Sequence, residues 1–595
     1  MCVRKNPLQF DMKKGNDRWI RLGRTFLQFV SVVVCILITL VNTRATLLHV
    51  RAYSKDLEMI RQAKGQVKNE SHRFVTLSKH IGTISDVVKP RVSSMTLFDT
   101  VPYLNSIVLP SHYPKGKVAI LGVKFIMDRD FPIWDRTFSN HGFEPVKTSK
   151  KQMLKGMHED WVVLKCLDLF DGQSHCIDAK ALPELKPHQK VSRLYGLRRI
   201  LWNKDRFCET MNSALEGFLP DIEFVFPCWM LPKDYTRLIK QSKTIYEGRS
   251  FILKPTDRGE GNGIIVLDTV QQLSNWKSRF PDNDEVVVQT YLPNPFLING
   301  RKWDMRTYVL VTSVSPLRLY MYRDGLVRFA SSQYDKDAKG GGKATSFLTN
   351  TSVNKKGGAA VDDLTWPFPK VYRWLNAHGI DAGLLWQRIE RAVTQMMLTA
   401  EPSFINEFRK LKPGFQCTGC YQLLGVDVIV DDQLVPRVIE VNGEPSMQLT
   451  GEVGSHYDHT KTGMTSDLVS LVFDIDEKAA SIVASDFFDL ELEGVSIGFE
   501  DNGGCTSTND FCLTTKDLEY LLEMRRESSR MGGFRRLYPS REGDFFDSYV
   551  NHVKRKFPSG YKLGSFRLHK LVTALEKLTS PSSFNNSIDD PLYRE

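Results

Sequence analysis

The amino-acid sequence predicts an α+β fold. Short apolar runs rich in Val and Ile, which are typical of buried strands, recur along most of the chain, and helix-like segments lie between them without regular β-α-β alternation. One uncharged apolar stretch near the N-terminus stands apart and predicts a single membrane-spanning helix ahead of the folded part. The 595 residues, 42% hydrophobic and 25% charged, suffice for several domains and exclude a fibrous or wholly disordered protein.

The apolar stretch, residues 25–41, is just long enough to cross a bilayer as a helix. Seven basic and two acidic side chains precede it, and basic flanks stay in the cytosol, so we expect a basic cytosolic tail at 1–24, a signal anchor at 25–41 and a lumenal remainder. Residues 42–114 are polar, without sustained apolar periodicity, and we interpret them as a stalk. A buried core helix is the alternative interpretation of the apolar stretch.

Eight cysteines follow the apolar stretch, and an oxidising lumen would allow them to form disulfides. Three pairs are close in sequence: Cys166 and Cys176, Cys417 and Cys420, and Cys505 and Cys512. The connectivity stays open, because sequence alone does not determine it. Half a zinc site or a redox motif at Cys417–Cys420 is an alternative, but no second ligand pair accompanies it. Asn69 begins an N-glycosylation sequon.

The first half of the folded part mixes strand and helix signals. We expect N-terminal and central subdomains over residues 115–245. In chain order, the predicted elements are strands at 118–126 and 161–169, a helix within 193–219, and a further helix opened by Pro232.

Strands dominate the second half, and we expect a separate core over residues 246–475. Its predicted elements are strands within 250–255, 263–268, 285–292, 304–313 and 317–330, a helix at 370–400, and a hairpin at 421–442 that turns at Asp431 and Asp432. The last segment, residues 476–595, predicts a helical, basic C-terminal region.

A lysine and a glycine-rich loop follow the first strand of this core. Lys254 lies near the end of that strand, and Gly259, Gly261 and Gly263 alternate after it. Glycines let backbone N–H groups approach a phosphate closely, and a lysine supplies positive charge. The spacing does not match a P-loop. A flexible hairpin turn is the alternative interpretation.

Two further segments gather polar side chains. Lys302, Asp304 and Arg306 alternate along a strand and therefore share a face, where they need partners or a charged ligand if they are buried. A solvated edge strand would also carry them. The run from Phe347 to Lys355 is rich in hydroxyl and amide groups. A plain surface loop is the alternative interpretation of this run.

The predicted hairpin brings together three oxygen-bearing side chains. Asp427 lies on one arm, while Glu440 and Asn442 lie two residues apart on the other and share a face. Mg²⁺ prefers such oxygen ligands and usually shares its coordination shell with nucleotide phosphates. A structural hairpin with surface acids is the alternative.

In order, these segments resemble the ATP-grasp arrangement, and their residues resemble the tubulin–tyrosine ligase-like family over about residues 115–475. The segments that carry the resemblance are KPTDRGEGNGI, VQTYLPNPFLINGRKWDMRTYVLVTS, LYMYRDGLVRFASSQY, FLTNTSVNK and YQLLGVDVIVDDQLVPRVIEVNGEPS, with RLYGLRRILWNKDRF and FPCWMLPKDY upstream.

The resemblance implies an ATP-grasp catalytic core over residues 246–475 that uses ATP and Mg²⁺. It implies that the nucleotide contacts Lys254, Glu260, Gly261, Asn262, Gly263, Gln289, Thr290, Tyr291, Leu292, Lys302, Asp304, Thr349 and Asn350. It implies Mg²⁺ ligation by Asp427, Glu440 and Asn442. It gives Arg306 and Arg328 catalytic roles facing the acceptor and the incoming amino acid, which Arg328, Thr351 and Ser352 would contact.

Three positions depart from the family pattern. Phe347 stands where the family usually has histidine, and Gln422 stands where glutamylases commonly have glutamate and the tyrosine ligase has glutamine. The residues around Gly443 are also closer to the tyrosine ligase. The amino acid that is donated therefore stays open.

The resemblance implies a ligase that adds an amino acid to a protein carboxylate through an acyl-phosphate, with glutamate as the favoured donor and polyglutamylation as the candidate activity. The alternatives are a tyrosine or glycine ligase acting on tubulin or a lumenal acidic protein, and a non-catalytic ATP-binding pseudoenzyme that holds an acidic partner. The net charge of +11 suits an acidic partner, but no nucleic-acid-binding motif accompanies it.

The predicted topology conflicts with a cytosolic acceptor such as the tubulin tail. We expect a type II membrane protein of the endoplasmic reticulum or Golgi with a lumenal catalytic part and a secretory-pathway acceptor. If residues 25–41 do not insert in this way, the protein would act in the cytoplasm on microtubules.

Overall fold

The structure is a computed structural model that describes most of residues 115–473, with short internal gaps, and parts of residues 497–572. All of these residues belong to the second of two compact units, Ile107–Glu595. The tail, signal anchor and stalk predicted for residues 1–114 lie outside the described residues and stay predictions. In the part of the chain that the structure describes, no helix is long and apolar enough to span a bilayer.

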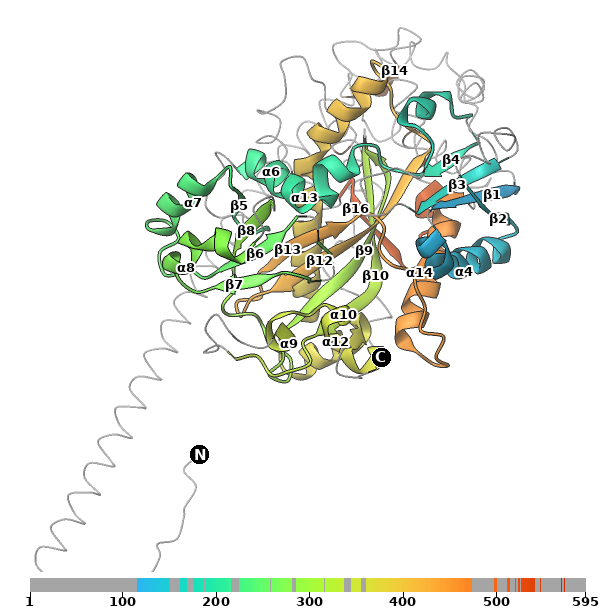
Figure 1. The fold of residues 1–595 in the computed structure, drawn as a ribbon. Coiled ribbons are helices and arrows are strands. Elements are labelled where there is room, and N and C mark those ends of the chain that lie inside the picture. Colours follow the sequence, from blue (N-terminus) through green and yellow to red (C-terminus); the bar gives the residue numbers. More distant parts are fainter. Residues whose placement is uncertain are drawn as a thin grey trace, which may run out of the picture. The chain divides into compact units, whose positions relative to one another are not determined.

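A ten-stranded sheet forms the framework (Figure 1). Its strands are β1 (Lys117–Gly122), β2 (Glu144–Thr148), β3 (Trp161–Leu167), β4 (Lys190–Ser192), β9 (Trp303–Val314), β10 (Leu317–Phe329), β11 (Thr365–Pro367), β12 (Cys420–Val430), β13 (Pro436–Asn442) and β16 (Phe534–Tyr538). The N-terminal strands β1 to β4 pair in parallel, and β4 pairs with β12. The remaining pairs are antiparallel, with β9 between β10 and β12.

Alternation along β9 determines which helices cover each face of this sheet. Met305 and Val309 pack in one core with α12 (Phe368–Ala377) and α13 (Ala382–Leu411). Tyr308 and Leu310 pack in another core with α4 (Lys124–Asn140) and α14 (His456–Phe473). Asp304 and Arg306 alternate in step with Tyr308 and therefore lie on the α14 face.

A smaller antiparallel sheet has the strand order β5-β8-β6-β7. Its elements are β5 (Cys228–Leu231), β6 (Phe251–Pro255), β7 (Ile265–Leu267), β8 (Val286–Thr290), α7 (Tyr235–Ser242), α8 (Val270–Ser274) and η3 (Trp276–Arg279). Trp229, Phe251 and Leu273 pack in its own core. Thr269 and Gln272 form a capping box that begins α8. This sheet carries Lys254 on β6 and Gln289 on β8.

The remaining elements of the described residues are short. They are η1 (Ala179–Glu184), the π-helical turn η2 (Arg198–Trp202), α6 (Lys204–Leu215), α9 (Ala344–Phe347), α10 (Thr351–Asn354), α11 (Val361–Leu364), β14 (Ile497–Phe499) and β15 (Phe511–Leu513). The sequence predicts a helical region at residues 476–595. The described parts of this region also contain the strands β14, β15 and β16.

The α+β class is confirmed, and two element predictions need correction. The run 118–126 is not one strand, because β1 ends at Gly122 and α4 begins at Lys124. The predicted helix at 370–400 is two helices, and Gly379, with φ of +75°, lies between them in a conformation that ends a helix. The predicted hairpin at 421–442 is present as β12 and β13.

Three disulfides occur among the described residues. They join Cys166 to Cys176, Cys208 to Cys228 and Cys417 to Cys420, with Cα atoms 5.3, 5.8 and 5.3 Å apart. Two of these pairs are ones that the sequence singles out by proximity. Cys505 lies outside the described residues, so its pairing with Cys512 stays a prediction.

Candidate active site

A cleft that is partly open to solvent lies between the two sheets. The small sheet contributes Lys254 and Gln289 to its lining, and the large sheet contributes Lys302 and Glu440. Of the predicted nucleotide and metal residues, those that line the cleft are Lys254, Gly261, Gln289, Thr290, Tyr291, Leu292, Lys302, Asp304, Thr349, Asn350, Asp427, Glu440 and Asn442. Segments far apart in the sequence therefore converge on one cleft.

Two buried lysines lie on the wall of the cleft. The Lys254 ammonium donates to Gln289 Oε1 at 2.6 Å, and the Lys302 ammonium donates to the Tyr291 hydroxyl at 3.1 Å. Burial lowers the pKa of Lys254 to about 8, against the carboxylates of Glu440 and Asp427. Burial also lowers the pKa of Lys302 to about 7, against Asp304. An anion bound beside these lysines would stabilise their charged form.

The glycine-rich loop approaches the same cleft. Gly261 has φ of +81°, and a Cβ there would lie 3.1 Å from the Val353 side chain and 3.3 Å from Asn350 Oδ1. Only glycine suits this close, left-handed position. Asn262 and Gly263 are exposed on the loop, and Glu260 lies outside the described residues.

A bidentate ion-pair network closes the deep end of the cleft. Arg328 donates to both oxygens of Asp304, at 2.7 and 2.6 Å, and to Asp427 Oδ2 at 2.8 Å. Arg306 donates to both oxygens of Asp427, and Thr349 donates to Asp304 Oδ2 at 2.7 Å. Burial alone would raise the pKa of Asp427, but Arg306 and Arg328 outweigh it and lower that pKa to about 2.

The three predicted metal ligands meet on the hairpin. Asp427 lies directly opposite Glu440 in the β12–β13 register, and Asn442 Nδ2 donates to Glu440 Oε1 at 3.3 Å. Both oxygens of Asp427 already accept from arginines, whereas Glu440 accepts a hydrogen bond only from Asn442 among the described residues. The oxygen donors suit a hard cation, with Glu440 as the ligand that needs least rearrangement.

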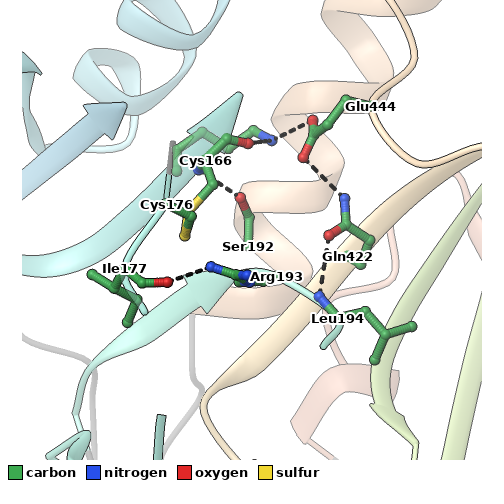
Figure 2. The surroundings of a disulfide bond; sticks show 9 residues. Cys166, Cys176, Ile177, Ser192, Arg193, Leu194, Gln422 and Glu444 are labelled. Carbon is green, nitrogen blue, oxygen red and sulfur yellow. Dashed lines mark hydrogen bonds and ion pairs between the residues drawn. A yellow bond between two sulfur atoms is a disulfide. The ribbon is translucent and has the colours of Figure 1, made fainter. Parts of the chain in front are cut away.

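Gln422 lies between Glu444 and Leu194 and is hydrogen-bonded to both (Figure 2). Gln422 Nε2 donates to Gly443 O at 2.7 Å and to Glu444 Oε1 at 3.0 Å, and its Oε1 accepts from Leu194 N at 3.2 Å. Glu444 also pairs with buried Lys165 at 3.0 Å. Lys165 directly precedes Cys166, so the Cys166–Cys176 disulfide lies beside this network (Figure 2).

Some predicted residues do not line the cleft. Arg306 reaches it only through Asp427, and Thr351 begins α10 outside the lining. The side chain of Ser352 lies outside the described residues. The predicted amino-acid contacts of Thr351 and Ser352 therefore stay predictions.

The sequence did not single out several residues that line the cleft. Trp202, Phe226 and Ile439 are apolar and carry no motif, and Lys204 and Arg258 are ordinary basic residues until the fold brings them to the opening. Phe347, the residue that departs from the family histidine, also lines the cleft, and its ring lies 6.4 Å from that of Tyr291.

The sequence of this chain is similar to one protein family and to several known proteins. The model of the tubulin-tyrosine ligase family matches residues 183–481, just over half of the chain. Tubulin monoglutamylase TTLL4 of Homo sapiens is 28% identical over 405 residues, 62% of this chain and 32% of the relative. Tubulin polyglutamylase TTLL6 of Mus musculus is 28% identical over 317 residues, 52% of this chain and 37% of the relative.

Another relative matches a shorter part of the chain. Tubulin polyglutamylase TTLL7 of Homo sapiens is 30% identical over 284 residues, 45% of this chain and 31% of the relative. The chain spans roughly a third of the length of these curated relatives.

Proposed function

Because this chain belongs to the tubulin-tyrosine ligase family, we propose that it is an ATP-dependent ligase that joins a free amino acid to a protein carboxylate. The observation that carries the proposal is the pairing of two buried lysines with an acidic hairpin across one cleft. Lys254 and Lys302 would bind ATP phosphates, and Asp427, Glu440 and Asn442 would hold Mg²⁺. Bound Mg²⁺ would neutralise phosphate charge.

The proposed reaction has two displacement steps. An acceptor carboxylate oxygen attacks the γ-phosphorus of ATP, which forms an acyl-phosphate and releases ADP. The amino group of the free amino acid then attacks the acyl carbon, loses a proton, and releases phosphate. Arg328 lines the cleft and Arg306 pairs with Asp427, and their positive charge would stabilise the negative charge that develops in the transition state.

We propose glutamate as the donated amino acid. The relatives are described as monoglutamylases and polyglutamylases, which supports glutamate over tyrosine or glycine. Gln422 is consistent with either class, because it contacts Gly443 and Glu444 and does not line the cleft.

For the acceptor we propose an acidic protein of the secretory pathway, reached by a catalytic part anchored through residues 25–41. The three disulfides support this placement, because disulfides persist in oxidising compartments and are rare in the cytosol. The names of the relatives favour tubulin as the second candidate acceptor.

The test is amino-acid transfer by the full-length chain in detergent, with ATP, Mg²⁺ and an acidic acceptor peptide. Glu, Gly and Tyr are supplied separately, and mass spectrometry of the acceptor is the readout. We expect a mass gain with Glu only. Glu440→Gln should abolish it, because the metal site loses one negative charge, while the protein stays folded.

The matched control is Glu144→Gln, which alters an exposed glutamate on β2 and should keep full activity. Full turnover by the Glu440→Gln variant would refute the metal assignment. Tight ATP binding without transfer to any acidic acceptor would favour the pseudoenzyme.

A further inference from the structure

The Cys417–Cys420 disulfide differs from the other two disulfides in the part of the chain that the structure describes. Its cysteines are 3 positions apart, whereas the other two pairs are separated by 10 and 20 positions. In the chain-entropy account, a disulfide stabilises a fold by restricting the unfolded chain, and this effect grows with the loop that the bond closes. The Cys417–Cys420 bond closes the shortest loop, so stabilising the fold explains it least.

The two cysteines of this pair also differ in burial. Cys417 is half-buried in the loop between α13 and β12, and its neighbours Gln416 and Thr418 are exposed. Cys420 begins β12 and is only 5% exposed. The four cysteines of the other two disulfides are at most 3% exposed. A thiolate attacks a disulfide at a sulfur that it can reach, so attack is favoured at Cys417 over the other five cysteines.

Backbone contacts hold the loop around this pair independently of the disulfide. Val191 N donates to Gly419 O at 2.8 Å, and Cys420 N donates to Cys417 O at 3.4 Å. A Cβ on Gly419 would lie 2.6 Å from Gln189 O, so the loop packs directly on the backbone at the start of β4. These contacts would keep the two thiols beside each other after reduction, so that the disulfide can form again.

A buried lysine brings positive charge to the same loop. Lys190, the first residue of β4, is 7% exposed, and its ammonium donates at 3.2 Å to the carbonyl oxygen of Thr418. Thr418 lies between the two cysteines in the sequence. A nearby ammonium stabilises a thiolate, and a stabilised thiolate is a better leaving group in thiol–disulfide exchange. Lys190 therefore favours the reduced form of the pair.

We propose that Cys417 and Cys420 form a redox-active disulfide that exchanges with a small thiol. The thiolate of one small thiol attacks Cys417 Sγ, the bond to Cys420 breaks, and Cys420 leaves as a thiolate. The thiolate of a second small thiol then attacks the sulfur of the first, and Cys417 leaves as a thiolate. The two small thiols end as one disulfide, and the cysteine pair gains two electrons and two protons. This activity does not depend on the proposed ligase function.

The experiment exposes the folded full-length chain in detergent to reduced glutathione and follows each disulfide over time. Samples are quenched with acid and alkylated, and mass spectrometry of the peptides measures the reduced fraction of each pair. The Cys417–Cys420 pair should open roughly 10-fold or more faster than the other two pairs, because its sulfur is the accessible one. Equal rates for the three pairs, or opening only after unfolding in guanidinium, would overturn the proposal.

Single-cysteine variants identify the sulfur that reacts. Cys420→Ser leaves Cys417 as a thiol, which should form a mixed disulfide with oxidised glutathione. Cys417→Ser leaves the buried Cys420, which should react roughly 10-fold or more slowly. Faster reaction of Cys420 than of Cys417 would overturn the assignment of Cys417 as the attacked sulfur.

The lysine is tested through the equilibrium of the pair with a glutathione redox buffer. Lys190→Met should shift this equilibrium toward the disulfide by about threefold or more, and Lys190→Arg, which keeps the charge, should restore it. Lys186→Met removes an exposed lysine four residues earlier and should leave the equilibrium unchanged, because solvent screens that charge. An equilibrium that does not respond to Lys190→Met would reject the role of this lysine in favouring the dithiol.

Discussion

Lys254 and Lys302 bring two ammonium groups to the same end of the cleft, each held by a neutral side-chain oxygen. Burial lowers both pKa values, to about 8 and about 7, so each lysine changes its charge in or just above the physiological range. Bound phosphate would raise both pKa values again, since an adjacent anion favours the charged form. The proposed assignment of these two lysines to phosphate therefore predicts that nucleotide binding is coupled to proton uptake.

This coupling predicts opposite pH trends for nucleotide affinity and for stability. The lysine pKa values of the folded protein lie below the unfolded value of 10.5, so the unfolded chain binds more protons from about pH 7 to 10. These two lysines therefore make the nucleotide-free protein more stable against unfolding as the pH rises through that window. The affinity for a non-hydrolysable ATP analogue should instead fall about 10-fold or more from pH 6.5 to 9.

Calorimetry and urea unfolding across this pH range measure the two trends. Lys302→Met is the diagnostic variant, because it should weaken nucleotide binding and flatten its pH dependence. Affinity that does not change with pH in the wild-type protein would contradict the assignment of these lysines to phosphate.

At the scale of elements, strand β16 ties the C-terminal region to the catalytic sheet. β16 pairs with β10, and Glu527, a few residues before it, makes an ion pair with buried Arg318 at 3.0 Å. The Tyr320 hydroxyl donates to the same carboxylate at 2.8 Å. The family match ends at residue 481, so this support for β10 comes from residues beyond the matched segment.

We predict that Glu527→Ala destabilises the protein by about 3–5 kcal/mol, since it leaves the Arg318 charge buried and unpaired. The double variant Arg318→Met with Glu527→Leu should recover most of that loss, because it removes both charges. The urea midpoint measures both effects. Asp128→Ala, which removes an exposed ion pair with Lys147, is the control and should shift the midpoint little. Equal loss in the single and double variants would show that the charge pairing is unimportant.

At the scale of the whole molecule, the disulfides bear on the redox state of the cellular compartment in which the chain folds. Two of them close short loops in the sequence, and the third joins α6 to β5. Their number and distribution are typical of a chain that folds in an oxidising lumen. This is the compartment that the sequence predicts from the basic flank of residues 25–41.

The lumenal topology predicts two chemical marks on protein isolated from cells. Without reductant, an alkylating agent should leave the six cysteines of the three disulfides unmodified. The chain should also lose mass on glycosidase treatment, and Asn69→Gln should remove much of that loss. Full alkylation together with no glycan would place the catalytic part in the cytosol.

The sequence predicts the motif residues of the cleft better than the residues around them. Lys254, Asp304 and Glu440 were predictable because strand periodicity and the family pattern fix their chemistry locally. Trp202 and Lys204 were not, because their position at the cleft depends on tertiary neighbours that no local pattern encodes. The break near Gly379 was missed for a related reason, since apolar residues continue on both sides of it.

The contact between Gly443 and Trp202 constrains how this site can change over evolutionary time. A Cβ on residue 443 would lie 2.4 Å from the Trp202 ring, at the end of the strand that carries Glu440 and Asn442. A side chain at residue 443 therefore requires the Trp202 ring to move or a smaller residue to replace it. Substitutions at these two positions affect each other for this reason.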